Sequence, residues 1–571
     1  MRAPVAWNTG GLSCGLSECM QPRSASRSAP TTLPPAARPR YVYVPPSREK
    51  ALGALPVVAE FCRRLDLAGI VDRACPVREV ALVTHGQVIE ALVANRLTSP
   101  TPLWRVEDWA RAWAVTEVFG IDPACLNDDR IGRALDAIAP ELDRLVGSVG
   151  ARAITAFGLD VTRLHWDLTS ISLFGAYDDP EAGFVAPRWG KPKDRRSDLK
   201  QVQTGLAVTG DGGVPVFHRA YDGGAGETAQ VIGAMTALKQ LAGRRRFLVV
   251  GDSKLVSYAN LRAMGQAGVV FIAPASKTYV DADVLAAQDL KAATPVDHVA
   301  SRDQHKPPDQ RGRYRVTEDT MTLHGKRTRD PALPVRRVFV WSSARADAAR
   351  ANRARKLDRA RDDLGRLTRG LGGRHYPDPD AVTARVGAIA ASRRVKDYLR
   401  AQVDTNQAGK PTLAWSFDQA ALDAEQAADG WYALLTNLTP AQADAAEVLH
   451  RFKGQEVVER RMGAFKGPLA VAPLFLKSNR RIAALITVIC LALLLFCLVE
   501  RQARRAIAPA TMLNGLYVRR PAKPTGRLIF QALASLRLAP ATATDPPGIP
   551  RPPPLQARLM ELLNVDPTQP R

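Results

Sequence analysis

The stretch Leu164-His165-Trp166-Asp167-Leu168-Thr169 decides the fold. Its residues alternate between apolar and polar, which predicts a β-strand whose side chains point to opposite faces of a sheet. Leu164, Trp166 and Leu168 share the face that we expect to be buried. Asp167 lies on the other face, together with His165, which we interpret as a packing or supporting residue. The pattern therefore predicts a carboxylate that is held on a strand and faces a functional site.

Further strands and helices follow this stretch. Residues 201–208 and 214–221 read as a strand pair, 246–252 and 269–273 as short buried strands, and 226–241 and 253–264 as helices, with Ser253 as the cap of the second. The order strand, strand, strand, helix, strand, helix, strand predicts an α/β fold with a mixed sheet. Asp252 ends one of the buried strands, and ligands of open α/β sheets gather at such carboxyl ends.

The rest of the chain is expected to surround this core. We predict a disordered leader over 1–48, a helical and DNA-binding domain over 49–152, core segments over 153–275 and 441–505, a β-rich insertion with a basic helix over 276–440, and a loosely ordered Pro/Arg-rich region over 506–571. The apolar run 482–499 has the minimum length for a membrane span, but a buried core helix looks the same in sequence and is the interpretation that we favour.

Charge and cysteine content narrow the class of protein. Lys and Arg number 79 against 56 Asp and Glu, and the net charge of +23 favours a polyanionic partner such as nucleic acid. A basic surface is also a common result of Arg-rich composition, so the net charge alone does not establish that the partner is nucleic acid. The seven cysteines form no CxxC pair, which argues against a zinc site or a disulfide framework and fits a reducing cytosol.

A third acid lies far along the chain, in the helical stretch 441–461. Residues Phe452, Gln455, Glu459 and Lys466 recur at helical spacing, which predicts that they share one helix face. Together with Asp167 and Asp252, Glu459 would complete a cluster of carboxylates. Oxygen ligands of this kind suit hard divalent cations such as Mg²⁺.

These acids, in this order and on these elements, resemble the catalytic triad of insertion-sequence-4-like DDE transposases. The resemblance covers most of residues 159–504. In that family an RNase H-like core is interrupted by a β-rich insertion, and the helix with the third acid carries the signature Tyr-x2-Arg-x3-Glu-x6-Lys. Glu459 and Lys466 match the signature, whereas Phe452 replaces its tyrosine and Gln455 replaces its arginine.

The resemblance implies a function and a set of roles. Asp167, Asp252 and Glu459 would hold two Mg²⁺ or Mn²⁺ ions, which serve the cleavage and transfer of DNA strands. Contacts to DNA would come from Lys466, Gln455, Arg460 and Arg461. The partners implied are the terminal inverted repeats, the target DNA and a second copy of the chain, in bacterial cytoplasm at the nucleoid and without a membrane.

Two kinds of alternative stay open at this stage. Glu456 is a rival third acid, although choosing it moves Lys466 out of register. An isolated Asp at a strand end is more often a cap or a turn former. A catalytic role for the two aspartates is therefore supported only by their combination with the helix that carries Glu459. The chain could also be another RNase H-like metal nuclease or recombinase, or a domesticated, inactive DNA-binding protein.

Overall fold

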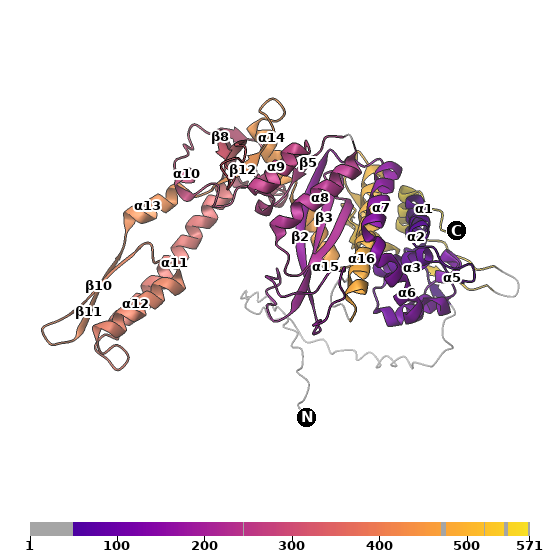
Figure 1. Cartoon of the computed structure of the whole chain (residues 1–571), viewed down its shortest axis with the longest axis horizontal. Coiled ribbons are helices and arrows are strands. Elements are labelled where there is room, and N and C mark those ends of the chain that lie inside the picture. Colours follow the sequence, from indigo (N-terminus) through magenta and orange to yellow (C-terminus); the bar gives the residue numbers. More distant parts are fainter. Residues whose placement is uncertain (1–48, 244, 470–475, 519, 542–545, 569–571) are drawn as a thin grey trace, which may run out of the picture. The chain divides into compact units, whose positions relative to one another are not determined.

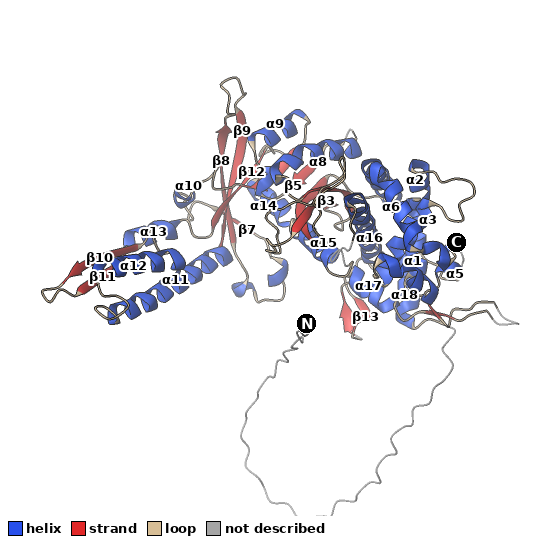
Figure 2. Ribbon diagram, turned by 60° about the horizontal axis from the view of Figure 1, so that its bottom comes forward, coloured by secondary structure: helices blue, strands red, loops and turns tan. Residues whose placement is uncertain are grey.

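A large mixed sheet organises the computed structural model (Figures 1 and 2). The structure describes residues 49–571 except 244, 470–475, 519, 542–545 and 569–571, so the predicted leader lies outside the described residues. Nine of the described strands form one sheet, in the order β4-β3-β2-β5-β6-β12-β9-β8-β7. The prediction of a mixed α/β fold is confirmed.

The strands around Asp167 form one half of this sheet. β2 (Arg163–Leu173), β3 (Lys200–Thr209) and β4 (Pro215–Asp222) are antiparallel neighbours, whereas β5 (Leu248–Val250) and β6 (Val270–Pro274) run parallel to β2. Helices α8 (Glu227–Ala242) and α9 (Tyr258–Gln266) precede β5 and β6 in the chain. A parallel neighbour requires such a crossover, whereas an antiparallel one needs only a turn.

The start of α9 differs from the prediction. The Asp252 side chain caps a short 3-10 turn over Ser253–Leu255, and the α-helix begins only after Ser257. The Ser257 hydroxyl accepts a hydrogen bond from the backbone N of Asn260 at 3.1 Å. Ser257, not Ser253, therefore satisfies the first free donors of this helix.

The other half of the sheet comes from the middle of the chain. β12 (Trp431–Thr436), β9 (Leu333–Ser342), β8 (Tyr314–Leu323) and β7 (Thr294–Val296) continue the sheet beyond β6, each antiparallel to its neighbour. These strands lie inside or at the end of the segment predicted as an insertion. They extend the core sheet and do not form a separate one.

Between β9 and β12 the chain forms what we call the arm, residues 343–427. Its elements are α11 (Ser343–Arg369), α12 (Pro379–Arg393), β10 (Leu399–Thr405), β11 (Pro411–Phe417) and α13 (Gln419–Ala427). Figure 1 shows α11 and α12 side by side, and the arm has an apolar cluster of its own that includes Leu364, Val386 and Tyr398. The predicted basic helix corresponds to α11, but the region is at least as helical as it is β.

Seven helices precede the sheet. They are α1 (Leu55–Leu65), α2 (Leu67–Ala74), α3 (His85–Thr98), α4 (Val106–Ala112), α5 (Val115–Phe119), α6 (Asp128–Ile138) and α7 (Leu142–Phe157). The third of them begins with a capping box, in which Thr84 and Gln87 satisfy each other's backbone N–H groups. Several of these helices pack against one long helix from the far end of the chain.

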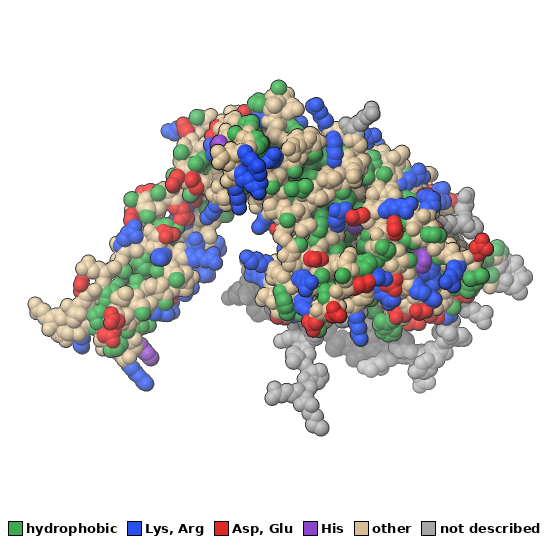
Figure 3. Space-filling model, in the orientation of Figure 1, with side chains coloured by type: hydrophobic (Ala, Val, Ile, Leu, Met, Phe, Trp, Pro, Cys, Tyr) green, Lys and Arg blue, Asp and Glu red, His purple; other side chains and the backbone are tan. Residues whose placement is uncertain are grey.

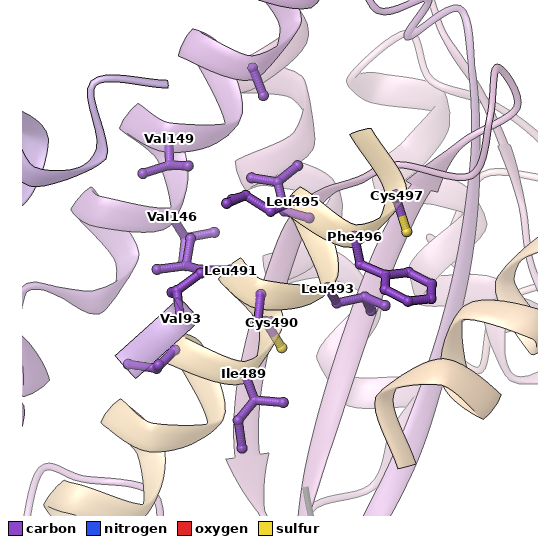
Figure 4. Close-up of a cluster of buried hydrophobic side chains, with 14 of the residues drawn as sticks. Val93, Val146, Val149, Ile489, Cys490, Leu491, Leu493, Leu495, Phe496 and Cys497 are labelled. Atoms are coloured by element: carbon purple, nitrogen blue, oxygen red, sulfur yellow. The ribbon is translucent and has the colours of Figure 1, made fainter. Parts of the chain in front are cut away.

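That helix is α16 (Asn479–Ala506), the apolar run that could be mistaken for a membrane span. Among the described residues it is the one helix long and apolar enough to cross a membrane, with a mean hydropathy of 3.2, but its apolar window is completely buried. Figure 4 shows its residues Leu491 and Leu495 beside Val146 and Val149 of α7. The predicted core helix is confirmed.

The region after α16 is more ordered than predicted. α17 (Gly526–Leu533) and α18 (Pro554–Leu563) both pack on α16 through buried residues such as Ile529 and Leu559. The Pro-rich composition dominated the sequence pattern, yet each helix presents an apolar face at helical spacing. The expectation of a loosely ordered tail is wrong for these described helices.

Candidate active site

Asp167 on β2 and Asp252, two residues beyond the end of the parallel neighbour β5, lie at about the same level. The register of β2 and β5 pairs Leu164 with Val249 and His165 with Val250. Two further residues along each strand lead to Asp167 and Asp252, and neighbouring strands lie about 4.8 Å apart. Consistent with this approach, a Cβ atom added to Gly251 would lie 3.5 Å from the carbonyl oxygen of Trp166. The fold thus brings together two acids that are 85 residues apart, since 252 minus 167 is 85.

The environment of Asp167 destabilises the negatively charged form of its carboxylate. Its side chain is 17% exposed and lies between the buried residues Trp166 and Leu168. Burial raises the pKa of Asp167, the nearby charge of Asp252 raises it further, and Lys193 opposes both effects without cancelling them. A cation placed between the two carboxylates would relieve this repulsion.

Among the described residues, Lys193 is the cation that contacts this pair of acids. Its ammonium lies 3.3 Å from Oδ1 of Asp167 and also donates a hydrogen bond to the carbonyl of Leu168. The loop that carries Lys193 is fixed to β2, because the backbone N of Lys193 donates to the hydroxyl of Ser170 at 2.8 Å. Asp252 has no such cation, and its Oδ1 accepts the backbone N–H of Lys254 at 2.9 Å.

The helix predicted to carry the third acid is broken in two. α14 (Ala445–Lys453) and α15 (Glu456–Lys466) meet at Gly454 and Gln455. Gly454 packs against the ring of His165 so closely that an added Cβ would lie 2.9 Å from its Cε1 atom. The prediction of a single helix face from Phe452 to Lys466 is therefore wrong, because Phe452 belongs to the first helix.

Gln455 joins α15 to β2. Its Nε2 donates to the carbonyl oxygen of Trp166 at 3.2 Å, and its Oε1 lies 3.1 Å from Nδ1 of His165. Because a carbonyl oxygen can only accept, the amide is oriented with Oε1 toward His165, whose Nδ1 then carries the hydrogen. Burial lowers the pKa of His165 to about 4, so the ring is neutral. The expected DNA contact of Gln455 is corrected to a link between helix and strand.

The position of Glu459 along β2 can be estimated from the contacts at the two ends of α15. It follows Gln455 by one helical turn, about 6 Å along the axis of α15. At the other end of α15, Lys466 is near enough to Lys193 and Asp167 for their charges to affect its pKa, which burial lowers. With α15 fixed near His165 at one end and near Lys193 at the other, one turn of helix corresponds to about two residues of β2. We therefore infer that Glu459 lies at about the height of Asp167 along β2, whereas its side chain lines a hollow with Ser301 and Arg302.

The Glu459 carboxylate itself is free of protein partners. It is exposed, lines a hollow of about 590 Å³ with Ser301, Arg302 and Arg460, and forms no hydrogen bond or ion pair with another described residue. The rival acid Glu456 accepts a hydrogen bond from the hydroxyl of Ser301 at 3.1 Å. Of these two acids, Glu459 is the one whose oxygens are uncommitted.

The two arginines after Glu459 have different environments. Arg460 is exposed beside the hollow, whereas Arg461 is buried. The guanidinium of Arg461 pairs with Glu500 of α16 at 2.9 Å and donates to the carbonyl of Gly213 at 2.9 Å. The expectation that Arg461 contacts DNA is therefore wrong, because its donors are used inside the fold.

The donor set fits a hard divalent cation, although only two acids are gathered. No group of three or more His, Cys, Asp or Glu side chains in the described ranges is arranged to hold a metal ion. Asp167 and Asp252 offer only oxygen ligands, and the raised pKa of Asp167 marks a place where positive charge is in deficit. Glu459 lies at the same level but its carboxylate is not drawn into the pair.

Sequence reasoning missed Lys193, Gly454 and the link from Gln455 to His165. Lys193 lies in a basic run after Gly190, and this run offers a signal of anion binding but not of its target. Gly454 offers a weaker signal, as a glycine inside a helical pattern. The link between positions 165 and 455 has no signal in a single sequence.

Comparisons with known proteins give one family match and similarities to solved structures. Residues 47–146 match the family described as "Domain of unknown function (DUF4277)", and no curated protein matches the chain. Among solved structures, the chain is similar to one from "Cryo-EM structure of piggyBac transposase synaptic complex with hairpin DNA". That likeness has a TM-score of 0.37 and 8% sequence identity, and it covers 92% of this chain and 85% of the other. A likeness of this size establishes neither a shared fold nor a shared function, so the residues of the site must carry the functional argument.

Proposed function

We propose that the chain is a DDE-type DNA transposase with an RNase H-like core formed by β4, β3, β2, β5 and β6. The observation that carries the proposal is the register of β2 and β5, which brings Asp167 and Asp252 level on neighbouring strands. The docking of α15 beside Asp167 supports Glu459 as the third acid. A domain that only bound DNA would have no need of this half-buried pair of acids.

In this proposal the three acids hold Mg²⁺ or Mn²⁺ beside the scissile phosphate. When bound, such ions stabilise the charge that develops on the phosphate and activate the attacking oxygen. The chain's own groups position the DNA: Arg460 is an exposed cation next to Glu459, and Lys466 is an exposed cation at the end of α15. Water attacks first and a 3′-hydroxyl second, and no covalent bond between enzyme and DNA is required.

The partners follow from this reaction. The DNA substrates are the terminal inverted repeats of the chain's own element and a target duplex. Because two ends must be cut together, we propose that two copies of the chain act on one pair of ends. The setting would be bacterial cytoplasm, at the nucleoid.

The test is cleavage and joining of end DNA by the full chain. Duplexes that span the DNA flanking the coding region are incubated with Mg²⁺ or Mn²⁺, or with chelator, and the products are separated on denaturing gels. We expect metal-dependent nicks with 3′-hydroxyl ends and joined products. Asp167→Asn and Asp252→Asn should each lower the rate by about 10³-fold, the scale for losing a group that stabilises charge in a transition state.

The control is Asp404→Asn, which removes an exposed acid from β10 of the arm and should leave the rate unchanged. Cleavage without joined products would identify a metal nuclease or a recombinase of another type. Binding of DNA without cleavage would identify a DNA-binding protein that has lost activity. Cleavage that survives either site substitution at the wild-type rate would refute the proposed site.

A further inference from the structure

The longest helix of the arm separates its side chains by face. Residues Arg353, Leu357, Ala360, Leu364 and Leu367 of α11 are buried and recur at intervals of three or four. A second stripe, Asn352, Arg355, Lys356 and Arg359, lies beside it at positions i, i+3, i+4 and i+7. We call this second set the cationic stripe. Figure 3 shows Lys and Arg side chains gathered over the α11 side of the arm.

The cationic stripe lines a hollow together with the end of α12. The hollow has a volume of about 330 Å³, and its remaining lining residues are Ser392, Arg393 and Arg394. Five of the seven lining residues are cations, and none is an acid or an apolar residue. Arg393 has an acidic partner, since its Nε lies 2.6 Å from Oδ2 of Asp363. The other four cations of the hollow have no acidic partner in the part of the chain that the structure describes.

Four other arginines of α11 are paired with acids, unlike the cations of the stripe. Arg350 pairs with Asp347, Arg361 with Asp358 at 2.8 Å, and Arg366 with Asp363 at 2.9 Å. The buried Arg353 pairs with Asp429 at 2.5 Å.

Arg355, Lys356 and Arg359, by contrast, have no hydrogen-bond or ion-pair partner among the described side chains. Arg355 and Arg359 are moreover four residues apart on one helix, a spacing at which like charges destabilise it. Arg345 and Arg369, near the two ends of α11, also lack an ion pair among the described residues, but Arg355, Lys356 and Arg359 are the cations of this helix that line the hollow.

We propose that the cationic stripe and Arg394 form a phosphate-binding site for the backbone of double-stranded DNA. The stripe runs from Asn352 to Arg359, seven residue steps or about 10 Å along the helix, which matches about three phosphates of one strand at 3.4 Å each. The absence of apolar lining from the hollow disfavours a hydrophobic peptide or an inserted lipid chain. The choice of DNA among polyanions rests on the proposed function, and the site would hold a part of the duplex other than the one that is cut.

The test measures DNA binding without cleavage. The full chain in chelator is titrated into a labelled 25-base-pair duplex of arbitrary sequence, at salt concentrations from 50 to 300 mM, and binding is followed by fluorescence anisotropy. The stripe variant is Arg355→Gln/Lys356→Gln/Arg359→Gln. The matched control is Arg350→Gln/Arg361→Gln/Arg366→Gln, which removes the same charge from the same helix but only from paired arginines.

The stripe variant should lose at least tenfold in affinity at 100 mM salt. The dependence of log affinity on log salt should become shallower by about 2 to 3, because each phosphate contact contributes about 0.9. The control should stay within threefold of wild type. Equal losses in both variants would reduce the effect to net charge and overturn the proposal, as would wild-type binding by the stripe variant.

Three further measurements separate loss of the binding site from unfolding and from binding of another ligand. Circular dichroism should show that the stripe variant melts no lower than wild type, because it loses like charges. If it unfolds, Arg394→Gln on α12 replaces it, with a smaller expected loss of about threefold. Unlabelled poly-glutamate and phosphatidylserine vesicles serve as competitors, and stronger competition by either than by unlabelled duplex would overturn DNA as the ligand. Because the binding assay contains chelator, it does not depend on the metal site. Binding by the stripe can therefore fail while cleavage succeeds, and cleavage can fail while binding by the stripe succeeds.

Discussion

The sheet edge at Asp167 and Asp252 and the cationic stripe of the arm both collect like charge, but they do so by different means. The acids come from positions far apart in the chain and are brought together by strand register, in a half-buried setting that raises the pKa of Asp167. The cations come from one helix, are gathered by its periodicity and remain exposed or half-buried. Each region favours a ligand of opposite charge. This preference is stronger at the acids, because burial removes water from their charge.

The arginines of the two regions also differ, because the role of each follows from its partners and not from its charge. Arg461 of α15 is buried against Glu500, whereas Arg359 of α11 is exposed and has no partner among the described residues. Both residues count equally toward the net charge of +23. Only the second can add to the attraction of a polyanion.

The largest effect should come from Arg461→Ala. It removes the buried arginine from the carboxylate of Glu500, which keeps Arg504 at 2.7 Å, and it leaves the carbonyl of Gly213 without this donor, so we expect a loss of about 3 kcal/mol in the free energy of unfolding, the lower end of the range for a broken buried pair. Arg359→Ala should change that free energy by less than about 0.5 kcal/mol, as is usual for exposed positions. Urea denaturation followed by circular dichroism measures both. Similar small changes in the two variants would remove the distinction between structural and ligand-binding arginines.

A smaller effect should follow from cutting the link between α15 and β2. Gln455→Ala removes the hydrogen bonds to His165 and Trp166, each worth about 1 kcal/mol. If this link positions Glu459, the rate constant for cleavage should fall about tenfold while DNA affinity in chelator stays unchanged. Gln402→Ala, on β10 of the arm, is the matched control. A drop in DNA affinity at constant rate would instead make Gln455 a DNA contact, as the sequence first indicated.

The smallest effect is a gain in stability from Asp167→Asn in chelator. The folded-state pKa of Asp167 is raised above the value of 3.8 that applies without its surroundings. The stability from its protonated form is thus complete below pH 3.8 and lost as pH rises through the raised pKa. At pH 7 the charge is a liability, and the variant should be more stable by roughly 0.5 to 2 kcal/mol, a common scale for relieved functional sites.

Thermal melts at pH 7 and pH 5 check this prediction. The melting temperature of Asp167→Asn should exceed that of wild type at pH 7, and the difference should narrow at pH 5. Lys193 loses its partner in the variant, but it is 44% exposed and can be solvated. A lower melting temperature for the variant at pH 7 would show that the carboxylate stabilises the fold.

Local patterns predicted much of the fold and part of the site. The alternation from Leu164 to Thr169 and the short run before Asp252 corresponded to β2 and β5, because strand period and burial are local properties. The break at Gly454 was missed, because its cause is the ring of His165, nearly three hundred positions away. Arg460 and Arg461 look equivalent in sequence, and only the packing of α16 distinguishes them.

In the arm, the sequence predicted the helix but not which of its arginines are paired. Its basic helix was predicted, but the pairing of Arg350, Arg361 and Arg366 and the free stripe beside them depend on rotation about the helix axis and on α12. The continuation of the sheet through β12, β9, β8 and β7 was also not predicted, because strand partners far apart in the chain leave no local pattern.

The most direct test of the central claim is divalent metal binding by the two aspartates. Isothermal titration calorimetry of Mn²⁺ into wild type, Asp252→Asn and the arm control Asp404→Asn compares them without any DNA. We predict equal binding by wild type and the control, and binding at least about tenfold weaker in Asp252→Asn, since losing even a supporting group costs 10- to 100-fold. Equal Mn²⁺ affinity in all three proteins would contradict a shared metal site at Asp167 and Asp252.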